Sequence, residues 1–290
     1  MRPDGSSRTP RPRFPPCGPP VTSRKRRPWS ATPSSESSHA DPRTGASTLL
    51  ILFDIDGTLL RSGGAGPRSM ALAMKELHPP RHPGDEVDHE QLDTAGWLDP
   101  LIWRAMLEQL GHAIEEDRHE TFRRTYGAIL ARIIEEESPV YALEGAGDAA
   151  RWVHEHPDLE SALLTGNYPE TGRLKIEAAG LDPDHFRFGA WGSEAELRRG
   201  LPPLAIRRAA EELGLTVDPH QTVIVGDTPA DIDCAHHNGC RVIAVATGRF
   251  TEDQLRPHGA DVLLPDLSDL GRFQKAVDTA LAAGPRPTRS

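Results

Sequence analysis

The sequence predicts a doubly wound α/β fold, with a Rossmann-like parallel sheet core and an all-helical domain inserted into it. From residue 49 onward, short apolar runs alternate with segments of helical periodicity, and one long stretch breaks this alternation with helical patterns alone. None of the apolar runs alternates with polar residues, which is typical of strands that helices cover on both faces. Together these observations indicate a layered α/β core with a helical insert.

Each strand and helix of the core is indicated by its own local pattern. The predicted strands are the apolar runs at residues 49–53, 161–164, 222–225 and 242–246. The predicted helices between them span residues 169–179, 202–213 and 229–238. Each helix begins with proline, which suits the first helical turn, and glycine follows closely after its end.

The insert follows the first strand. Residues 66–139 contain no convincing strand pattern, whereas helical spacing appears at residues 69–77, 100–110 and 118–136. Glycine-rich stretches at 63–66 and 144–147 would flank the insert as turning or flexible joints. We therefore expect residues 48–65 and 140–290 to form the α/β core, and residues 66–139 to form the helical domain.

The amino-terminal 47 residues differ from the rest in composition. They contain ten prolines and nine serines, with nine Lys or Arg against three Asp or Glu. A segment with so few large apolar residues cannot bury enough surface to offset the entropy of ordering, so residues 1–47 are predicted to be a disordered basic tail. The remaining residues carry 24 basic and 40 acidic side chains, which argues against a nucleic-acid surface on the folded body.

Cysteine usage and hydropathy limit the cellular context. Three scattered cysteines (Cys17, Cys234 and Cys240) form no disulfide framework and fit a reducing compartment. No run of about 18 apolar residues is present, so neither a membrane span nor a membrane partner is expected. We expect a soluble cytoplasmic protein, whose oligomeric state the sequence leaves open.

The polar residues that directly follow three of the predicted strands are the candidates for chemistry. In open parallel sheets, ligands bind beyond the carboxyl ends of the strands. The polar residues at these ends are Asp54 and Asp56 after the first strand, Thr165, Gly166 and Asn167 after the second, and Asp227 and Asp231 after the third. The fourth predicted strand ends without a charged residue.

The spacing of the acidic residues favours a divalent cation. Asp54 and Asp56 point to the same side if the strand geometry persists, and their like charges repel. Carboxylates, carbonyls and water form the all-oxygen ligand set that suits Mg²⁺, and Asp227 is the natural third contributor. This reasoning alone describes a metal-binding site.

Further residues near the same sheet edge suggest catalysis on a phosphoryl group. The hydroxyl of Thr165 and the guanidinium groups of Arg198 and Arg199 could neutralise phosphoryl oxygens together with Mg²⁺. An aspartate can then attack phosphorus and form an aspartyl-phosphate. The competing interpretation of each motif taken alone is structural: a turn at residues 165–167 and a capped helix start at residues 228–231.

These motifs resemble those of the haloacid dehalogenase (HAD) superfamily of phosphohydrolases, in the same order and over essentially all of residues 48–270. The matching stretches are "DIDGT" at 54–58, "LLTGN" at 163–167 and "GDTPAD" at 226–231. The stretches "LKIEAAGLDPDHFRF" and "RVIAVATGRF" are similar to the phosphoglycolate-phosphatase-like branch, in which a helical cap follows the first motif and selects the substrate.

The resemblance implies a role for each residue. Asp54 would be the nucleophile and a Mg²⁺ ligand, and Asp56 the general acid and base, with its main-chain carbonyl on the metal. Thr165 would bind the phosphoryl group, with Gly166 and Asn167 beside it. Asp227 would hold Mg²⁺ directly, and Asp231 would support the metal either as a ligand itself or from just outside the ligand set. The third motif departs from the family pattern, because "ELRRGLPPLAI" offers only Arg198 or Arg199 where most relatives have lysine, and the sequence does not decide between them.

The predicted function is a Mg²⁺-dependent phosphatase of small phosphomonoesters, and phosphoglycolate is the leading candidate substrate. A sugar-phosphate or nucleotide phosphatase and a phosphomutase of the same superfamily are alternatives. Dehalogenation is disfavoured, because it needs no acid at the position of Asp56. A non-catalytic binding module with this fold is the alternative from a different class, and the retention of Asp54 and Asp227 counts against it.

Overall fold

A computed structural model describes residues 49–79, 86–89, 92 and 94–284. The predicted disordered tail and Cys17 lie outside the described residues. None of the helices in the described part of the chain is both long enough and apolar enough to cross a membrane.

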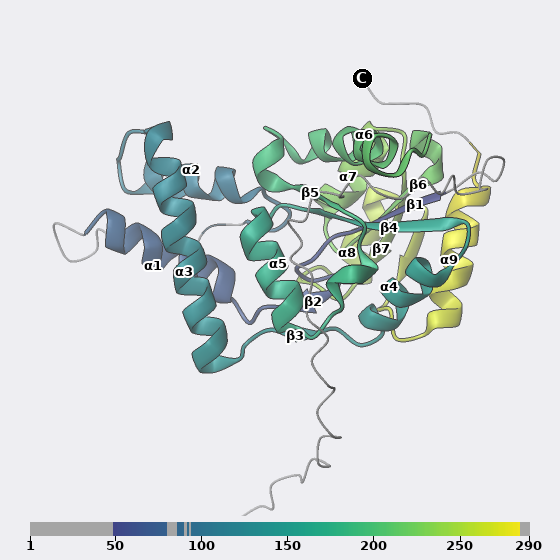
Figure 1. The fold of residues 1–290 in the computed structure, drawn as a ribbon, viewed down its shortest axis with the longest axis horizontal. Coiled ribbons are helices and arrows are strands. Elements are labelled where there is room, and N and C mark those ends of the chain that lie inside the picture. The colour runs from purple at the N-terminus through teal and green to yellow at the C-terminus, as the bar shows by residue number, and fades with distance from the viewer. Residues whose placement is uncertain (1–48, 80–85, 90–91, 93, 285–290) are drawn as a thin grey trace, which may run out of the picture. The chain divides into compact units, whose positions relative to one another are not determined.

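A six-stranded parallel sheet forms the centre of the core (Figure 1), and it confirms the predicted α/β fold class. Its strand order is β5-β4-β1-β6-β7-β8, with a crossover between the two halves at β1. The strands are β1 (Leu49–Phe53), β4 (Leu159–Thr165), β5 (Gly189–Trp191), β6 (Thr222–Gly226), β7 (Arg241–Val245) and β8 (Val262–Leu264).

Strand β1 lies inside the sheet, because β4 pairs with one edge of it and β6 with the other, both in parallel. Its side chains alternate between two apolar layers. Leu50 and Leu52 belong to a cluster with residues of α6 (Leu201–Leu213) and α7 (Pro229–His237). Phe53 packs against Phe273 of α9 (Leu270–Ala282). Burial on both faces explains why this strand is a continuous apolar run.

The remaining core helices complete the two layers around the sheet. Helix α4 (Ala146–Glu155) contacts β4 and α9. Helix α5 (Pro169–Ala178) follows β4 and contacts α3 of the insert, and the short α8 (Glu252–Leu255) lies against β8. Figure 1 shows α6 and α7 on one side of the sheet and α4 and α9 on the other.

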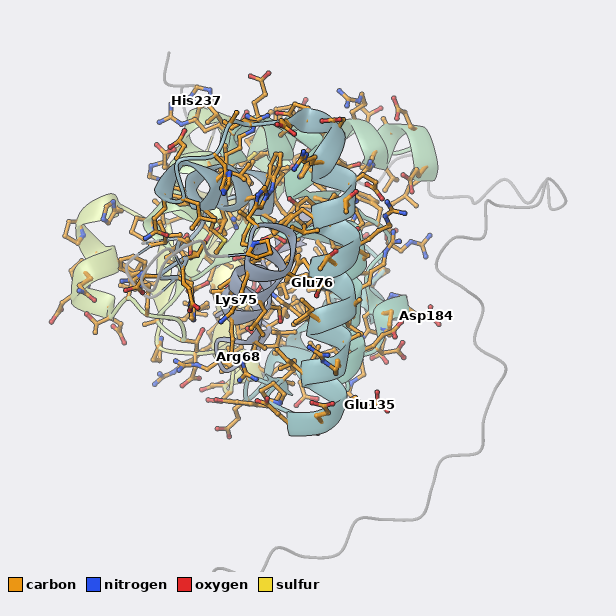
Figure 2. The ribbon with its side chains drawn as sticks, turned by 90° about the vertical axis from the view of Figure 1, so that its left-hand side faces the viewer. Arg68, Lys75, Glu76, Glu135, Asp184 and His237 are labelled. Atoms are coloured by element: carbon orange, nitrogen blue, oxygen red, sulfur yellow. The ribbon has the colours of Figure 1, made fainter. Side chains whose placement is uncertain are left out.

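The described residues of the insert include the α-helices α1 (Ala65–Leu77), α2 (Asp99–Gln109) and α3 (His119–Glu137). They share an apolar cluster that includes Trp103, Phe122 and Tyr126, together with Tyr168 of the core. Charged residues lie on the outer faces, among them Arg68, Lys75 and Glu76 of α1 (Figure 2). The guanidinium of Arg68 also forms an ion pair with Glu137 at the end of α3, which ties the first and last helices together.

The two chain crossings between core and insert lie side by side. Strand β2 (Leu60–Arg61) precedes the insert and pairs antiparallel with β3 (Tyr141–Ala142), which follows it. Gly63 has a φ of 55°, and a Cβ atom at this position would lie 3.2 Å from Cβ of Pro139. The two connections between core and insert therefore lie close together, joined by the pairing of β2 with β3.

Candidate active site

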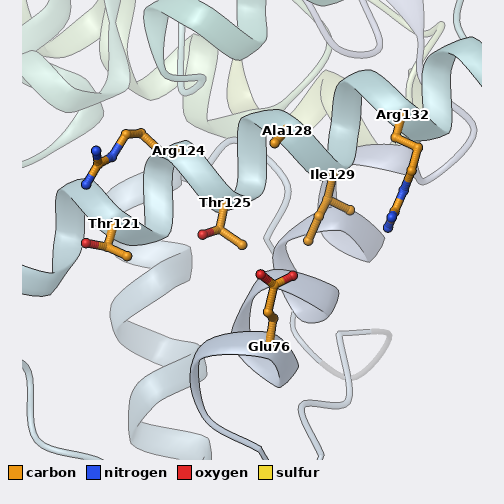
Figure 3. Close-up of a pocket in the computed structure, with 7 residues that line it drawn as sticks. All are labelled: Glu76, Thr121, Arg124, Thr125, Ala128, Ile129 and Arg132. Atoms are coloured by element: carbon orange, nitrogen blue, oxygen red, sulfur yellow. The ribbon is translucent and has the colours of Figure 1, made fainter.

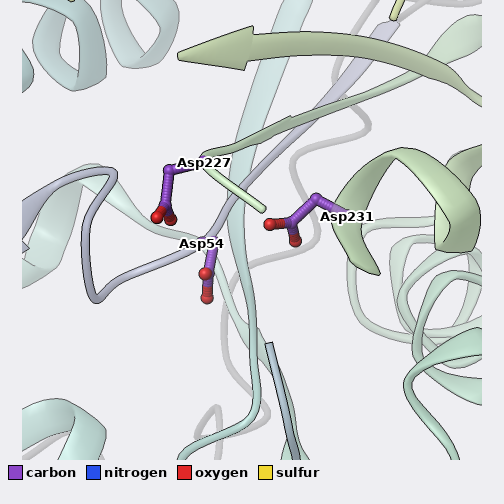
Figure 4. A group of neighbouring side chains, drawn as sticks. All are labelled: Asp54, Asp227 and Asp231. Atoms are coloured by element: carbon purple, nitrogen blue, oxygen red, sulfur yellow. The ribbon is translucent and has the colours of Figure 1, made fainter. Parts of the chain in front are cut away.

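Three aspartates from separate segments meet at the carboxyl edge of the sheet (Figure 4). Asp54 follows β1, Asp227 follows β6, and Asp231 lies in the first turn of α7. All three are buried, and carboxylate oxygens of the three lie within 4.8 Å of one another. Within the described part of the chain, this is the one group of acidic, His or Cys residues arranged to hold a metal ion.

The electrostatics of this cluster favour a cation. Burial raises the pKa of Asp54 to about 6, although Arg198 acts in the opposite direction. Burial, together with the charges of Asp54 and Asp231, raises the pKa of Asp227 well above its ordinary value. Crowded, buried carboxylates are most readily kept ionised by a hard dication, and an all-oxygen donor set is what Mg²⁺ prefers. The residues present therefore fit Mg²⁺.

Asp231 differs from the other two because hydrogen bonds engage both of its oxygens. Its Oδ1 accepts from Nε (3.1 Å) and Nη2 (2.6 Å) of Arg198. Its Oδ2 accepts from the main-chain N–H (3.1 Å) and the hydroxyl (2.7 Å) of Thr228. Asp231 thus completes a capping box at the start of α7 and anchors the arginine at the same time.

The structure distinguishes between Arg198 and Arg199, which the sequence alone could not do. Arg198 is buried, and its Nη2 lies 3.2 Å from Oδ2 of Asp54. Arg199 points elsewhere and forms a bidentate pair with Asp233, in which both side chains are about half exposed. Arg198 therefore belongs to the site, and the structure places Arg199 outside it.

Asp56 faces a pocket, and its side chain is 37% exposed. Its Oδ2 accepts hydrogen bonds from Nζ of Lys175 (2.7 Å) and Nδ2 of Asn167 (2.8 Å), while Oδ1 accepts from Ser62 (3.1 Å). Burial alone would raise the pKa of Asp56, but the charge of Lys175 and these hydrogen bonds outweigh it and lower the pKa. The carboxylate is consequently held in one orientation.

The residues after β4 lie against Asp56 and against the insert. Asn167 Nδ2 also donates to the hydroxyl oxygen of Thr165 at 2.8 Å, so the amide links Thr165 to Asp56. Gly166 is needed sterically, because a Cβ atom there would lie 2.0 Å from the carbonyl oxygen of Trp97. The main-chain N–H of Asp99 donates to the carbonyl of Gly166 at 2.8 Å, which fixes the start of α2 on the site.

A cavity of about 490 Å³ joins these residues. It is lined by the acidic residues Asp54, Asp56 and Asp227, by Thr165 and Arg198, and by residues of the insert that include Trp97 and Tyr126. A second hollow lies between α1 and α3, lined by Glu76 and the outer face of α3 (Figure 3). This second hollow contains none of the predicted site residues.

Sequence reasoning missed four charged residues of the cavity wall, Arg61, Asp99, Lys175 and Arg249. Of these, Lys175 and Asp99 are buried, whereas Arg61 and Arg249 are exposed. A signal for Lys175 was available, because it falls on the buried face of α5, one helical turn after Thr171 and beside Ile176. Asp99 gave no such signal, since an aspartate before proline at a helix start is ordinary.

Asp99 leads to a prediction about stability and pH. Burial raises the pKa of Asp99 to about 7, and Tyr168 N–H donates to its Oδ2 at 3.0 Å. Between about pH 4 and pH 7 the unfolded chain would lose a proton that the folded chain keeps, so this residue makes stability fall as pH rises through that window. Asp99→Asn keeps an acceptor for Tyr168 but cannot ionise. We expect the variant to gain about 2 kcal/mol relative to wild type between pH 5 and pH 8.

Urea unfolding of both proteins at several pH values measures this gap. Asp184→Asn, at an exposed residue (Figure 2), is the matched control and should run parallel to wild type. Parallel curves for wild type and Asp99→Asn would show that Asp99 does not titrate in this way.

Known proteins share both the sequence pattern and the fold. Residues 198–270, which include Arg198, Asp227 and Asp231, match the family model described as HAD-hydrolase-like. This part of the chain is therefore similar to the haloacid dehalogenase-like hydrolases. Pyrophosphatase PpaX of Bacillus pumilus is 24% identical to this chain over 225 residues, which cover 76% of this chain and 93% of the relative. The probable phosphatase IndB of Dickeya dadantii is 25% identical over 76% of this chain and 91% of its own length.

Solved structures share the fold of this chain at low sequence identity. A predicted phosphoglycolate phosphatase from Haemophilus somnus aligns with a TM-score of 0.58 and 20% identity, covering 78% of this chain and 98% of that one. A β-phosphoglucomutase from Clostridium difficile aligns with a TM-score of 0.60 and 15% identity, covering 81% and 99%. A hydrolase from Pseudomonas syringae gives a TM-score of 0.60 at 19% identity, covering 79% of this chain and 98% of that one.

Proposed function

We propose that this protein is a Mg²⁺-dependent phosphatase that hydrolyses small phosphomonoesters through an aspartyl-phosphate. The observation that carries the proposal is the meeting of Asp54, Asp227, Thr165 and Arg198 around one cavity. Two of the relatives carry the names pyrophosphatase and probable phosphatase, which supports phosphoryl chemistry.

In this proposal, Mg²⁺ would be held by the side chains of Asp54 and Asp227 and by the main-chain carbonyl of Asp56. Bound there, it would neutralise charge on the phosphoryl oxygens. Asp231 supports the site from outside the ligand set, because its oxygens are already engaged by Arg198 and Thr228. Arg198 Nη2 lies beside Asp54 and can also donate to a phosphoryl oxygen, as can the hydroxyl of Thr165.

The reaction divides into two displacements at phosphorus. In the first, a carboxylate oxygen of Asp54 bonds to phosphorus while the bond to the leaving oxygen breaks, and Asp56 gives a proton to that oxygen. Because the pKa of Asp56 is lowered, only the minority of molecules in which Asp56 is protonated carry out this step near neutral pH. In the second, Asp56, now ionised, takes a proton from water as the water oxygen attacks phosphorus. The bond to Asp54 then breaks, inorganic phosphate leaves, and both carboxyl groups return to their starting states.

The insert would act as a cap that selects the substrate. Its residues 96–99 lie on the site, because the Gly96 carbonyl accepts from Arg198 Nη1 (3.4 Å) and the Asp99 N–H donates to Gly166. Phosphoglycolate remains the leading candidate, and pyrophosphate joins it from the name of one relative. Sugar phosphates remain alternatives, as does phosphomutase activity, which would appear as isomerisation of a hexose phosphate. We propose a cytoplasmic location, as the sequence predicts.

A screen of small phosphoesters tests this function. It uses 5 to 10 substrates from each class, and each substrate is assayed with Mg²⁺ and with EDTA. We expect turnover of at least one class with Mg²⁺, near-complete loss with EDTA, and recovery when Mg²⁺ is restored. Turnover that is equally fast with EDTA would contradict the metal assignment. Absence of turnover for every class, with correctly folded protein, would favour the non-catalytic alternative.

A further inference from the structure

A buried lysine lies in the wall of the site outside the three matching motifs. Lys175 is on α5, and its side chain is 4% exposed. Removing an ammonium group from water is costly unless the charge is paired and hydrogen bonded. Its Nζ meets both conditions, since it lies 2.7 Å from Oδ2 of Asp56 and 2.7 Å from Oδ1 of Asn167. The lysine is thus placed on the residue proposed to move protons.

The contacts of Lys175 also fix the amide of Asn167. An ammonium group only donates, so the amide oxygen of Asn167 must face Lys175. The amide nitrogen then faces Asp56 and Thr165, as the structure shows, with distances of 2.8 Å to each. Lys175, Asn167 and Asp56 therefore form a closed triangle of hydrogen bonds, and Ser62 holds the remaining oxygen of Asp56.

The position of Lys175 between core and insert makes a purely structural role the competing explanation. A Cβ atom added at Gly66 of α1 would lie 3.3 Å from Nζ and 3.6 Å from the hydroxyl of Tyr126. The charge of Lys175 also acts on the buried Asp99 of α2. A residue that only joined the two parts would affect all substrates alike.

We propose that Lys175 is a positioning residue that holds Asp56 in the orientation needed to protonate the leaving group. This inference rests on the proposed phosphatase function. The proton passes from Asp56 to the leaving oxygen as the bond from phosphorus breaks, and Lys175 keeps its own protons throughout. Without Lys175, the carboxyl group and the amide of Asn167 can both rotate, so fewer encounters place the acid against the leaving oxygen.

Leaving groups of different basicity test this role. 4-Nitrophenolate leaves with little help from an acid, whereas an alkoxide needs a proton. For Lys175→Met, we expect kcat/KM, which reports the steps up to departure of the leaving group, to fall about 100-fold with an alkyl phosphate, against about 3-fold with 4-nitrophenyl phosphate. Lys275→Met makes the same substitution at an exposed position of α9 and should match wild type.

The outcomes separate this inference from the proposed function. Equal losses of kcat/KM for both substrates, or no loss for either, would overturn the positioning role while leaving the phosphatase function intact. Lys175→Gln, which is neutral and can still donate a hydrogen bond, serves as a second variant if Lys175→Met does not fold. If neither variant folds, Lys175 is a structural residue and the inference is wrong. A folded wild-type protein without turnover of any phosphoester would overturn the function itself, and the inference with it.

Discussion

Asp54→Asn should keep its fold and lose at least about 10⁴-fold in turnover, because the amide cannot act as a nucleophile toward phosphorus. Stability should change by no more than about 1 kcal/mol. The variant loses a contact with Arg198 but also removes a buried charge from beside Asp227 and Asp231. Phosphate release from the best substrate measures turnover, and urea unfolding measures stability.

A direct test of the intermediate accompanies this variant. Wild-type protein quenched in acid during turnover should carry a phosphoryl group that hydroxylamine removes, and Asp54→Asn should carry none. Asp233→Asn is the matched control, since Asp233 is exposed and pairs with Arg199 outside the site. If acid-quenched Asp54→Asn still carried a phosphoryl group, another residue would form the covalent bond to phosphorus.

Arg198→Met should show the largest effect on stability. The substitution leaves Asp231 and Asp54 without the cation that lies 2.6 Å from one and 3.2 Å from the other. Breaking a buried ion pair by removing one partner costs about 3 to 5 kcal/mol. Loss of a donor to the phosphoryl group should also lower kcat about 10² to 10³-fold. Urea unfolding measures the loss of stability, and steady-state kinetics measure the fall in kcat.

The neighbouring residue provides the control for that prediction. Arg199→Met removes an ion pair whose side chains are 48% and 51% exposed. Such a pair contributes about 0 to 1 kcal/mol, and Arg199 does not line the cavity, so both stability and turnover should stay close to wild type. Equal effects of the two substitutions would contradict the division of roles between these adjacent arginines.

The strands with the longest apolar runs were predictable from sequence, and the short ones were not. The first strand, at residues 49–53, agrees in both bounds with β1 because all of its faces are buried. Strands β5 and β8 were missed, since each has three residues and β5 includes a glycine. Runs of this length carry too little periodicity to separate strand from loop, and pairing with a longer neighbour is what makes them strands.

The candidate site was predictable where function depends on the end of a strand. Asp54, Asp227 and Thr165 follow their strands directly, so topology alone brings them to one edge. Choosing between Arg198 and Arg199 needed the path of the chain before α6, where one turn directs the first inward to Asp231 and the second outward to Asp233. Lys175 does not follow a strand directly. It lies on α5, which brings it back over the site, so the position of the strand ends did not predict it.

The antiparallel pair of β2 and β3 has a consequence for engineering. Because residues 60–61 and 141–142 are hydrogen bonded to each other, the chain leaves and re-enters the core at neighbouring points. Another helical segment whose own ends lie equally close could be spliced between them without altering the connectivity of the sheet or lengthening any core loop. Chimaeras built at this junction would let one reactive centre be paired with many different selecting modules.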